Sequence, residues 1–298
     1  MEIPQGGVQE PPIIEEPKEE IQKVEEPDLS FEPVAIPEVN KTIYTEGIYS
    51  NSKYTAVIPH SSELNALVCG RQECKGPVTY VAGNNDRNLK IRTKDGTIEI
   101  DPDNAFCESG VKNCFRRIYN RNWDYLKEEI KTYTINSINK FTDEISRRIF
   151  VGHMILALHQ NTKNGFGIIS YRDDKHFSKF AAEVFINPHE DNDVFAYVNT
   201  RGWFEILKSK GWNVVLQKND MGIDDGSISY AATWRNLPYV NIEVRIGDAY
   251  KQSQMVNTLN EILEEFPQLA SDMKFVIREN AITTWDRFEK EVRDGNIS

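Results

Sequence analysis

The chain has 298 residues, 39% of them hydrophobic, and a formal net charge of −11. This length is sufficient for one or two domains with a sizeable core. The longest apolar run, residues 149–158, is far shorter than the roughly 20 residues that cross a bilayer, so we expect no membrane protein. The acidic start is unlike a secretory signal, and with only four cysteines we predict a cytoplasmic or host intracellular protein.

Residues 1–40 carry most of the net charge. They contain eleven Asp/Glu and two Lys and are rich in proline, whereas residues 41–298 are close to neutral. The overall charge is therefore no argument for or against nucleic acid. A segment of this composition buries too little surface to offset its ordering entropy, so we predict a disordered acidic tail. It is either a solvating tail or a tethered segment that binds a protein partner.

Residues 41–114 predict a small β-rich module. Asn, Asp and Gly separate its short β-like runs, and residues 94–96 are typical of a hairpin turn. The runs cover residues 43–50, 53–59, 65–70, 77–83, 89–93 and 97–101.

Four cysteines lie in or beside this module, in two closely spaced pairs: Cys69 with Cys74, and Cys107 with Cys114. Thiolates are good zinc ligands, and two such pairs can close a structural zinc site, with His60 as a substitute ligand. The tight two-residue spacing typical of zinc sites is absent, so unlinked reduced thiols are the main alternative and disulfides or redox use a third. Basic residues in 116–121 either contact phosphates or form the solvent-exposed face of a helix.

Residues 115–164 predict a helical spacer, because apolar residues recur at three-to-five-residue steps from Trp123 onward. Its apolar stripe is part of the core or separates two domains. His153 and His159 are six residues apart, which does not place them side by side on a helix. We interpret both as ordinary core or surface histidines.

Residues 165–298 predict an α/β domain in which helices and strands alternate. The predicted strands are 167–171, 194–198, 212–218, 227–234, 239–246 and 274–279, and the predicted helices are 176–185, 201–210, 252–266 and 284–292. From residue 201 the predicted order is α-β-β-β-α-β-α. The whole chain is thus predicted as α+β, with a tail, a β-rich module, a helical segment and a C-terminal α/β domain.

The stretch around residue 243 is typical of a metal-dependent nuclease. Such an enzyme needs carboxylates that hold Mg²⁺ beside a scissile phosphate. Asp224 or Asp225 precedes a predicted strand, and Glu243 and Arg245 share one face of the next strand. Gln254 lies in the helix that follows. The non-functional alternative is an α/β domain in which Glu243 and Arg245 pair with neighbours or water.

Residues 201–294 resemble the restriction-endonuclease-like superfamily, and within it the virus-type replication-repair nuclease domain. The matching stretches are 207–215, 222–226, 242–254 and 274–288. The resemblance implies that Asp224 or Asp225 and Glu243 hold Mg²⁺ and that Gln254 orders the water or the strand. Arg245 stands where the family has lysine, and an arginine cannot lose its proton near neutrality.

Two functions follow as hypotheses. The first is a DNA-binding, nucleic-acid-processing protein whose magnesium nuclease domain is active or degenerate. The second is a non-enzymatic structural or assembly adaptor, such as a viral or phage virion component, that binds a partner through its acidic tail.

Overall fold

The computed structural model describes residues 31–271 apart from residues 152 and 164, and it contains eleven strands and seven α-helices in that part. The strands are β1 (Val34–Ile36), β2 (Lys41–Glu46), β3 (Thr55–Ile58), β4 (Val78–Ala82), β5 (Leu89–Thr93), β6 (Gly96–Ile100), β7 (Ile155–Asn161), β8 (Ala181–Phe185), β9 (Phe195–Val198), β10 (Val214–Gln217) and β11 (Tyr239–Arg245). The helices are α1 (Leu64–Glu73), α2 (Glu108–Tyr119), α3 (Glu128–Ile149), α4 (Ile168–Asp173), α5 (Arg201–Ser209), α6 (Ile228–Trp234) and α7 (Ala249–Glu265).

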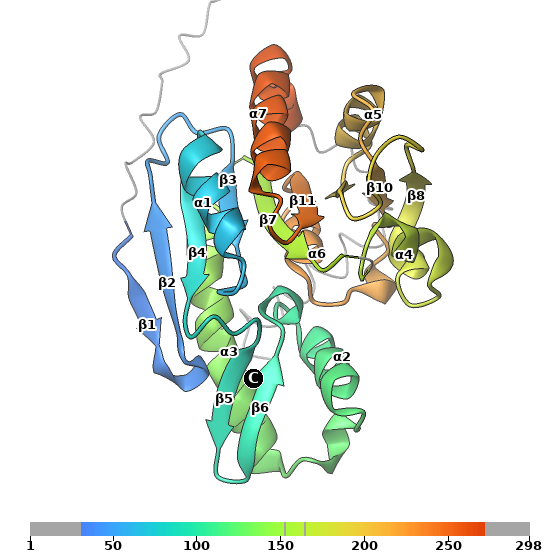
Figure 1. Cartoon of the computed structure of the whole chain (residues 1–298). Coiled ribbons are helices and arrows are strands. Elements are labelled where there is room, and N and C mark those ends of the chain that lie inside the picture. Colours follow the sequence, from blue (N-terminus) through green and yellow to red (C-terminus); the bar gives the residue numbers. More distant parts are fainter. Residues whose placement is uncertain (1–30, 152, 164, 272–298) are drawn as a thin grey trace, which may run out of the picture.

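Nine of these strands form one mixed sheet in the order β1-β2-β4-β3-β7-β11-β9-β10-β8. The four central strands β4, β3, β7 and β11 are parallel to one another, and antiparallel pairs flank them on both sides. The remaining strands, β5 and β6, pair as a separate hairpin that lies with α2 at one end of the sheet (Figure 1).

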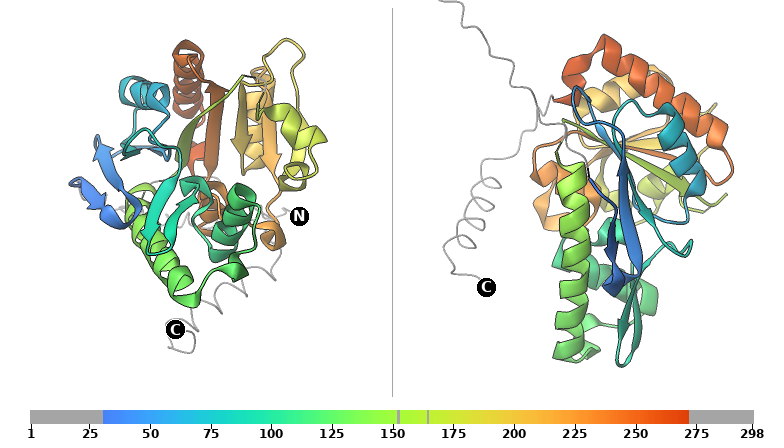
Figure 2. Two further views of the ribbon diagram at one scale, coloured as in Figure 1. Left: turned by 60° about the horizontal axis from the view of Figure 1, so that its bottom comes forward. Right: turned by 90° about the vertical axis from the view of Figure 1, so that its left-hand side faces the viewer.

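Helices cover both faces of the sheet. Figure 2 shows α3 on one side, and α1 and α7 on the other. Each face has its own core: one joins the sheet to α2, α3 and the β5–β6 hairpin, and the other joins it to α1, α5 and α7. Because both faces of the central strands are covered, β7 is buried along its whole length, as expected for a parallel strand.

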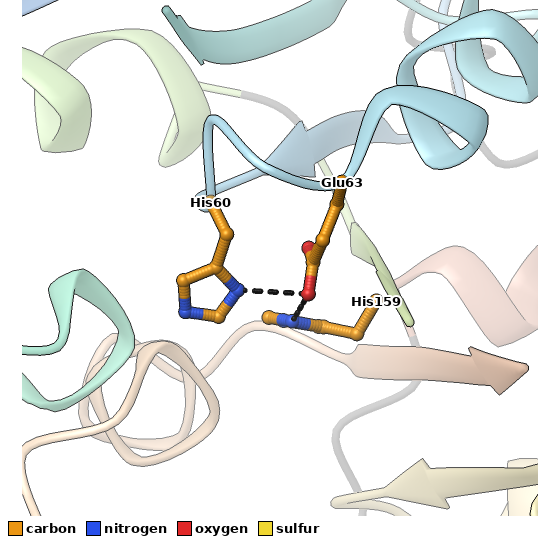
Figure 3. Close-up of side chains that lie close together, drawn as sticks. All are labelled: His60, Glu63 and His159. Carbon is orange, nitrogen blue, oxygen red and sulfur yellow. Dashed lines mark hydrogen bonds and ion pairs between the residues drawn. The ribbon is translucent and has the colours of Figure 1, made fainter. Parts of the chain in front are cut away.

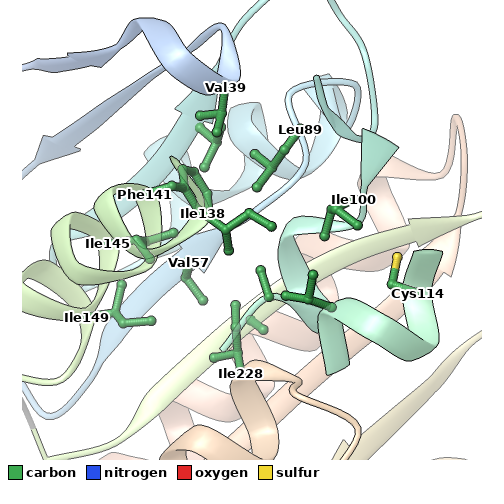
Figure 4. Close-up of a cluster of buried hydrophobic side chains, with 14 of the residues drawn as sticks. Val39, Val57, Leu89, Ile100, Cys114, Ile138, Phe141, Ile145, Ile149 and Ile228 are labelled. Atoms are coloured by element: carbon green, nitrogen blue, oxygen red, sulfur yellow. The ribbon is translucent and has the colours of Figure 1, made fainter. Parts of the chain in front are cut away.

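Helix α3 illustrates how the sequence determines its element. Its buried apolar side chains recur every three or four residues, including Ile138, Phe141, Ile145 and Ile149. They pack in the core with the β5–β6 hairpin (Figure 4). Acidic residues in its first turn and arginines in its last turn match the helix dipole.

The structure confirms a mixed chain of helices and strands. The predicted helices at 201–210 and 252–266 correspond to α5 and α7, and the predicted strands at 194–198, 212–218 and 239–246 correspond to β9, β10 and β11, each to within a few residues at its ends. The strand and the helix predicted within residues 274–292 lie outside the described residues, as does the tail before residue 31.

Other predicted elements were wrong. Residues 65–70 belong to a helix, 155–161 to a strand, 167–171 mostly to a helix, 176–185 mainly to a 3₁₀ turn and strand β8, and 227–234 to a helix. Part of the predicted tail, Val34–Ile36, is strand β1, which pairs with β2. The order from residue 201 is therefore α5-β10-α6-β11-α7, without the three consecutive strands that were predicted.

The causes of these differences are local. Strand β7 is buried at every position, so it has no solvent-exposed face. Its apolar run therefore lacks the polar positions that would distinguish a strand from a buried helix. Residues 227–234 have β-branched and aromatic side chains that favour a strand, yet the Ser227 hydroxyl accepts a hydrogen bond from the Tyr230 N–H and caps helix α6.

The sheet also joins segments that were predicted as separate units. Residues 41–114 supply β2, β3 and β4, residues 115–164 supply β7, and residues 165–298 supply the remaining strands after β7. Among the described residues, no helix is long and apolar enough to cross a membrane.

Candidate metal centre

The candidate site lies where three neighbouring parallel strands end. The carboxyl ends of β3, β7 and β11 meet at one edge of the sheet. From β3 the chain turns through α1 to β4 on one side, whereas from β7 it continues toward β8, β9 and β10 on the other. Ligand sites of open α/β sheets form at such a change of direction.

A tight turn after β3 brings His60 and Glu63 together. The Glu63 N–H donates to the His60 carbonyl at 3.1 Å, and α1 begins at the next residue. Glu63 occupies the N-cap position, but its carboxylate makes no capping hydrogen bond. The carboxylate points instead toward the histidines (Figure 3).

The ligand atoms of His60, Glu63 and His159 all lie within 4.8 Å of one another, and the three side chains are buried. Glu63 Oε1 is 3.0 Å from His60 Nδ1 and 3.5 Å from His159 Nδ1 (Figure 3). Two imidazole nitrogens and one carboxylate are a ligand set that catalytic zinc sites use, thermolysin and carboxypeptidase A among them. The group could therefore hold one metal ion and leave a coordination position open.

Asp101, directly after β6, lies behind His60. Its Oδ1 is 2.8 Å from His60 Nε2, on the side of the ring that faces away from Glu63. A histidine that binds metal through one nitrogen usually donates its other N–H to a carboxylate, which fixes the ring and its tautomer. Asp101 therefore supplies the contact that a metal-binding His60 requires.

The charges of the cluster balance one another in the metal-free protein. Burial opposes a charge on His60, but Glu63 and Asp101 raise its pKa to about 10. Burial would raise the pKa values of both acids, but the positive charge of His60 lowers them below their usual range. In the metal-free cluster a carboxylate oxygen faces each ring nitrogen of His60, which favours the protonated form of this side chain.

Arg87, which precedes β5, connects the cluster to solvent. Its guanidinium lies 3.4 Å from Glu63 Oε1 and 3.5 Å from Asp101 Oδ2, and its side chain is half exposed. The β5–β6 hairpin thus supplies Arg87 from one end and Asp101 from the other.

Two buried atoms of the cluster lack a hydrogen-bond partner among the described residues: Glu63 Oε2 and His159 Nε2. A buried unsatisfied polar atom costs about 1–3 kcal/mol, and such atoms in a native fold call for an explanation such as an ion or water. A carboxylate with one unpaired oxygen beside two imidazoles is a suitable binding site for a cation.

Glu243 lies beside these ligands on β11. It is the register partner of His159 on β7, and its side chain is 7% exposed. Burial raises the pKa of Glu243, and the charge of Glu63 adds to this effect, whereas His159 opposes it. The Asn241 amide donates to Glu243 Oε1 at 3.2 Å. A buried carboxyl with a raised pKa beside a metal site is suited to accept and return a proton.

The other residues predicted for a nuclease make contacts of their own, and Arg245 lies two residues from Glu243 on the same strand. Asp224 accepts hydrogen bonds from the Gly226 N–H at 2.7 Å and from Trp234 Nε1 at 2.6 Å. Arg245 forms an ion pair with Asp191. Gln254 is exposed on α7.

Asp225 accepts from the Ser227 N–H at 3.0 Å. Among the described residues, Asp224, Asp225 and Glu243 do not form a group of three ligand atoms for one ion.

The four cysteines are free and do not meet at one site. Cys69 and Cys74 belong to α1 and its C-cap, whereas Cys107 and Cys114 belong to the N-cap and body of α2. Within the described residues, the only three-ligand group is His60, Glu63 and His159. Burial raises the pKa of Cys69 to about 11 and that of Cys74 to about 12.

Sequence reasoning missed the candidate metal ligands. His60 was considered only beside the cysteines, and His159 was interpreted as an ordinary histidine. The available signal was a histidine and a glutamate three residues apart directly after a buried strand, with a further histidine in a later apolar run. Nothing local indicates that these two segments lie on neighbouring strands.

The loop that carries Asp225 packs tightly on α2, and this contact can be tested. A Cβ on Gly110 would lie 2.5 Å from the Asp225 carbonyl oxygen and 2.6 Å from that of Asn104. We expect Gly110→Ala to lower the free energy of unfolding by about 1–3 kcal/mol, measured by urea denaturation. Gly222→Ala on the same loop meets only an ordinary contact of 3.4 Å and is the control. Equal stability of both variants would contradict this packing.

No family model matches the chain, and no curated protein sequence matches it.

Proposed function

We propose that the protein is a zinc-dependent hydrolase of amide bonds, with His60, Glu63 and His159 as the zinc ligands and Glu243 as the general base. The observation that carries the proposal is the buried His-Glu-His group at the ends of three parallel strands, with Glu243 in register beside His159.

The ligand types favour zinc over magnesium. Mg²⁺ prefers oxygen ligands in octahedral geometry, whereas imidazole nitrogens suit zinc and related transition metals. Two of the three ligands here are imidazoles, and Asp101 orients one of them. A zinc ion in such a site lowers the pKa of a bound water to about 7 and polarises a carbonyl group.

In this proposal Glu243 transfers the proton and Arg87 stabilises the developing charge. Glu243 accepts a proton from the attacking water, whose oxygen bonds to the carbonyl carbon of the substrate. As the C–N bond breaks, Glu243 returns the proton to the leaving amine, so the products are a carboxylic acid and an amine. Arg87, half exposed beside Glu63, stabilises the negative charge that develops on the carbonyl oxygen.

The direct test is metal analysis of the purified chain together with hydrolysis of a mixture of short peptides. We expect about one zinc ion per chain and hydrolysis that a chelator abolishes and added zinc restores. His159→Ala should lose both zinc and activity, whereas His189→Ala, in an exposed loop, should keep both. A chain that binds no zinc at micromolar free metal would sink the proposal.

Nuclease activity and partner binding by the acidic tail stay predictions from the sequence. An assay of Mg²⁺-dependent DNA cleavage on the same preparations tests the first of them.

A further inference from the structure

Lys41 lies at the same edge of the sheet as the candidate metal centre. It opens β2, which runs antiparallel to β4, whereas β4 is parallel to β3. The start of β2 is therefore at the edge where β3 ends and where residues 60–63, named here the metal-ligand turn, follow. Lys41 and Ile43 share one face of β2, and Ile43 packs in the core with α3, so the aliphatic part of Lys41 borders that core.

The ammonium group of Lys41 joins two loops of the candidate metal centre. Its Nζ donates to the Ser61 hydroxyl at 2.8 Å and to the Asp86 carbonyl oxygen at 2.8 Å. The Ser61 hydroxyl donates to the same Asp86 oxygen at 2.7 Å, so the three groups form a closed triangle. Ser61 belongs to the metal-ligand turn, and Asp86 directly precedes Arg87. One side chain thus ties the metal-ligand turn to the loop of Arg87.

The surroundings hold Lys41 in one position. Lys41 is 5% exposed and Ser61 is 6% exposed. A Cβ on Gly83 would lie 2.8 Å from Lys41 Cδ and 3.1 Å from its Nζ, so the space for the lysine depends on the missing side chain at Gly83. A lysine on the surface adopts many rotamers, whereas this enclosed one keeps its hydrogen bonds in a fixed geometry.

The charge of Lys41 is costly where it lies. Burial lowers the pKa of Lys41, and the nearby Asp86 opposes that effect. Both oxygens that accept from Nζ are uncharged. A buried ammonium group with neutral acceptors costs free energy that a methionine of similar length would avoid. Packing therefore does not account for a lysine at this position, whereas its hydrogen bonds to the two loops do.

Resting on the proposed hydrolase function, we propose that Lys41 is a positioning residue of the candidate metal centre. Through Ser61 it holds the metal-ligand turn, and through the Asp86 carbonyl it holds Arg87 beside the ligand carboxylate. Metal affinity depends on the first of these links, and stabilisation of the developing charge depends on the second. Residues that orient a metal ligand typically change metal affinity or activity by about 10- to 100-fold when they are replaced.

Zinc affinity of the full chain, measured by competition with a chelator, tests the first link. We expect Ser61→Ala to weaken zinc binding about tenfold and Lys41→Met to weaken it by about 10- to 100-fold. Two controls should keep the affinity of the unaltered chain: Ser62→Ala, at the exposed neighbour, and Lys90→Met, which removes a partly exposed contact of 3.0 Å to the Asp86 carboxylate. Unchanged affinity in Ser61→Ala, or an equal loss in Ser62→Ala, overturns the first link, also where Lys41→Met does not fold.

Hydrolysis of short peptides at saturating zinc tests the second link, because lower metal affinity then no longer limits the rate. Lys41→Met should lower kcat about tenfold with little change in KM, since Arg87 acts on the transition state. In an Arg87→Gln background the same replacement should cost little more, because residues that act as one unit are not additive. If Lys41→Met does not fold, Ser61→Ala, which also removes a donor to the Asp86 carbonyl, takes its place in the cycle. An equal loss of kcat in both backgrounds makes the role merely structural and overturns the second link.

Failure of this inference and failure of the hydrolase function give different results. Peptide hydrolysis with native zinc affinity in Ser61→Ala and equal losses of kcat in both backgrounds overturns only the role of Lys41. Zinc binding without any peptide hydrolysis removes the hydrolase and the second link, while the zinc affinity of Ser61→Ala still decides the first. A chain that binds no zinc overturns both proposals.

Discussion

Replacing Glu243 by glutamine is expected to lower kcat for peptide hydrolysis by about 10²- to 10⁴-fold, the contribution typical of a general base, while zinc content stays at about one ion per chain. Glutamine has the same shape and keeps the oxygen that accepts from the Asn241 amide, but it cannot take a proton from water. Because Glu243 is not one of the three proposed metal ligands, the substitution separates proton transfer from metal binding.

Two controls define this result. Glu261→Gln, exposed on α7, should leave both zinc and kcat unchanged. Arg245→Gln distinguishes the zinc hydrolase from the nuclease suggested by the sequence, since Arg245 pairs with Asp191 and Asp193 and has no part in the proposed chemistry. Full peptide hydrolysis in Glu243→Gln would falsify the role of Glu243. Loss of zinc in that variant would make Glu243 a ligand instead.

Local patterns in the sequence predict several elements around the site. The period of apolar residues identifies α5 and α7, and the alternation at residues 239–246 identifies β11, so that Glu243 stands out as a carboxylate on a buried strand. The pattern of residues does not show which strand pairs with β11 in the sheet. Parallel pairing with β7 brings His159 beside Glu243 across more than 80 residues of chain, and no local propensity encodes that pairing.

The same limit explains why the sequence does not reveal the candidate metal ligands. His60 and Glu63 are three residues apart, but their meaning depends on His159, about 100 residues further on, and on Asp101 and Arg87 from a hairpin that folds over the strand ends. The apolar run that ends just before His159 also fits a buried helix, so the sequence alone does not show which way the His159 side chain points. Asp224 and Asp225 stand out in the sequence because they precede a predicted strand ahead of Glu243, although in the structure both carboxylates accept hydrogen bonds from local backbone groups.

Zinc affinity of the protein is expected to rise at least about tenfold for each pH unit between roughly pH 6 and pH 9, because zinc must displace a proton from His60. Burial opposes a charge on His159, but Glu63 raises the pKa of this second ligand too, so the slope is steeper where His159 is also protonated. With a pKa of about 10, His60 keeps this proton throughout that range. An unperturbed histidine titrates near 6.5, so its affinity curve would be flat above about pH 7. A chelator competition at several pH values measures the slope.

The free energies of the two steps indicate that zinc displaces the proton of His60 at neutral pH. Removing a proton at pH 7 from a group with a pKa of about 10 costs about 4 kcal/mol, against about 10–16 kcal/mol released by zinc binding in structural sites. Asp101→Asn removes one of the two acceptors that raise the pKa of His60, and so it should flatten the slope between pH 7 and 9.

The metal-free protein should show the opposite dependence. The folded pKa of His60 lies above its unfolded value near 6.5, so its contribution to stability is complete below that value and is lost as the pH rises toward 10. Thermal denaturation should therefore show a falling Tm from pH 7 to 10 without zinc and a much smaller change with zinc bound. A zinc affinity independent of pH above 7, together with a constant Tm in the metal-free protein, would mean that His60 is neutral between its two carboxylates.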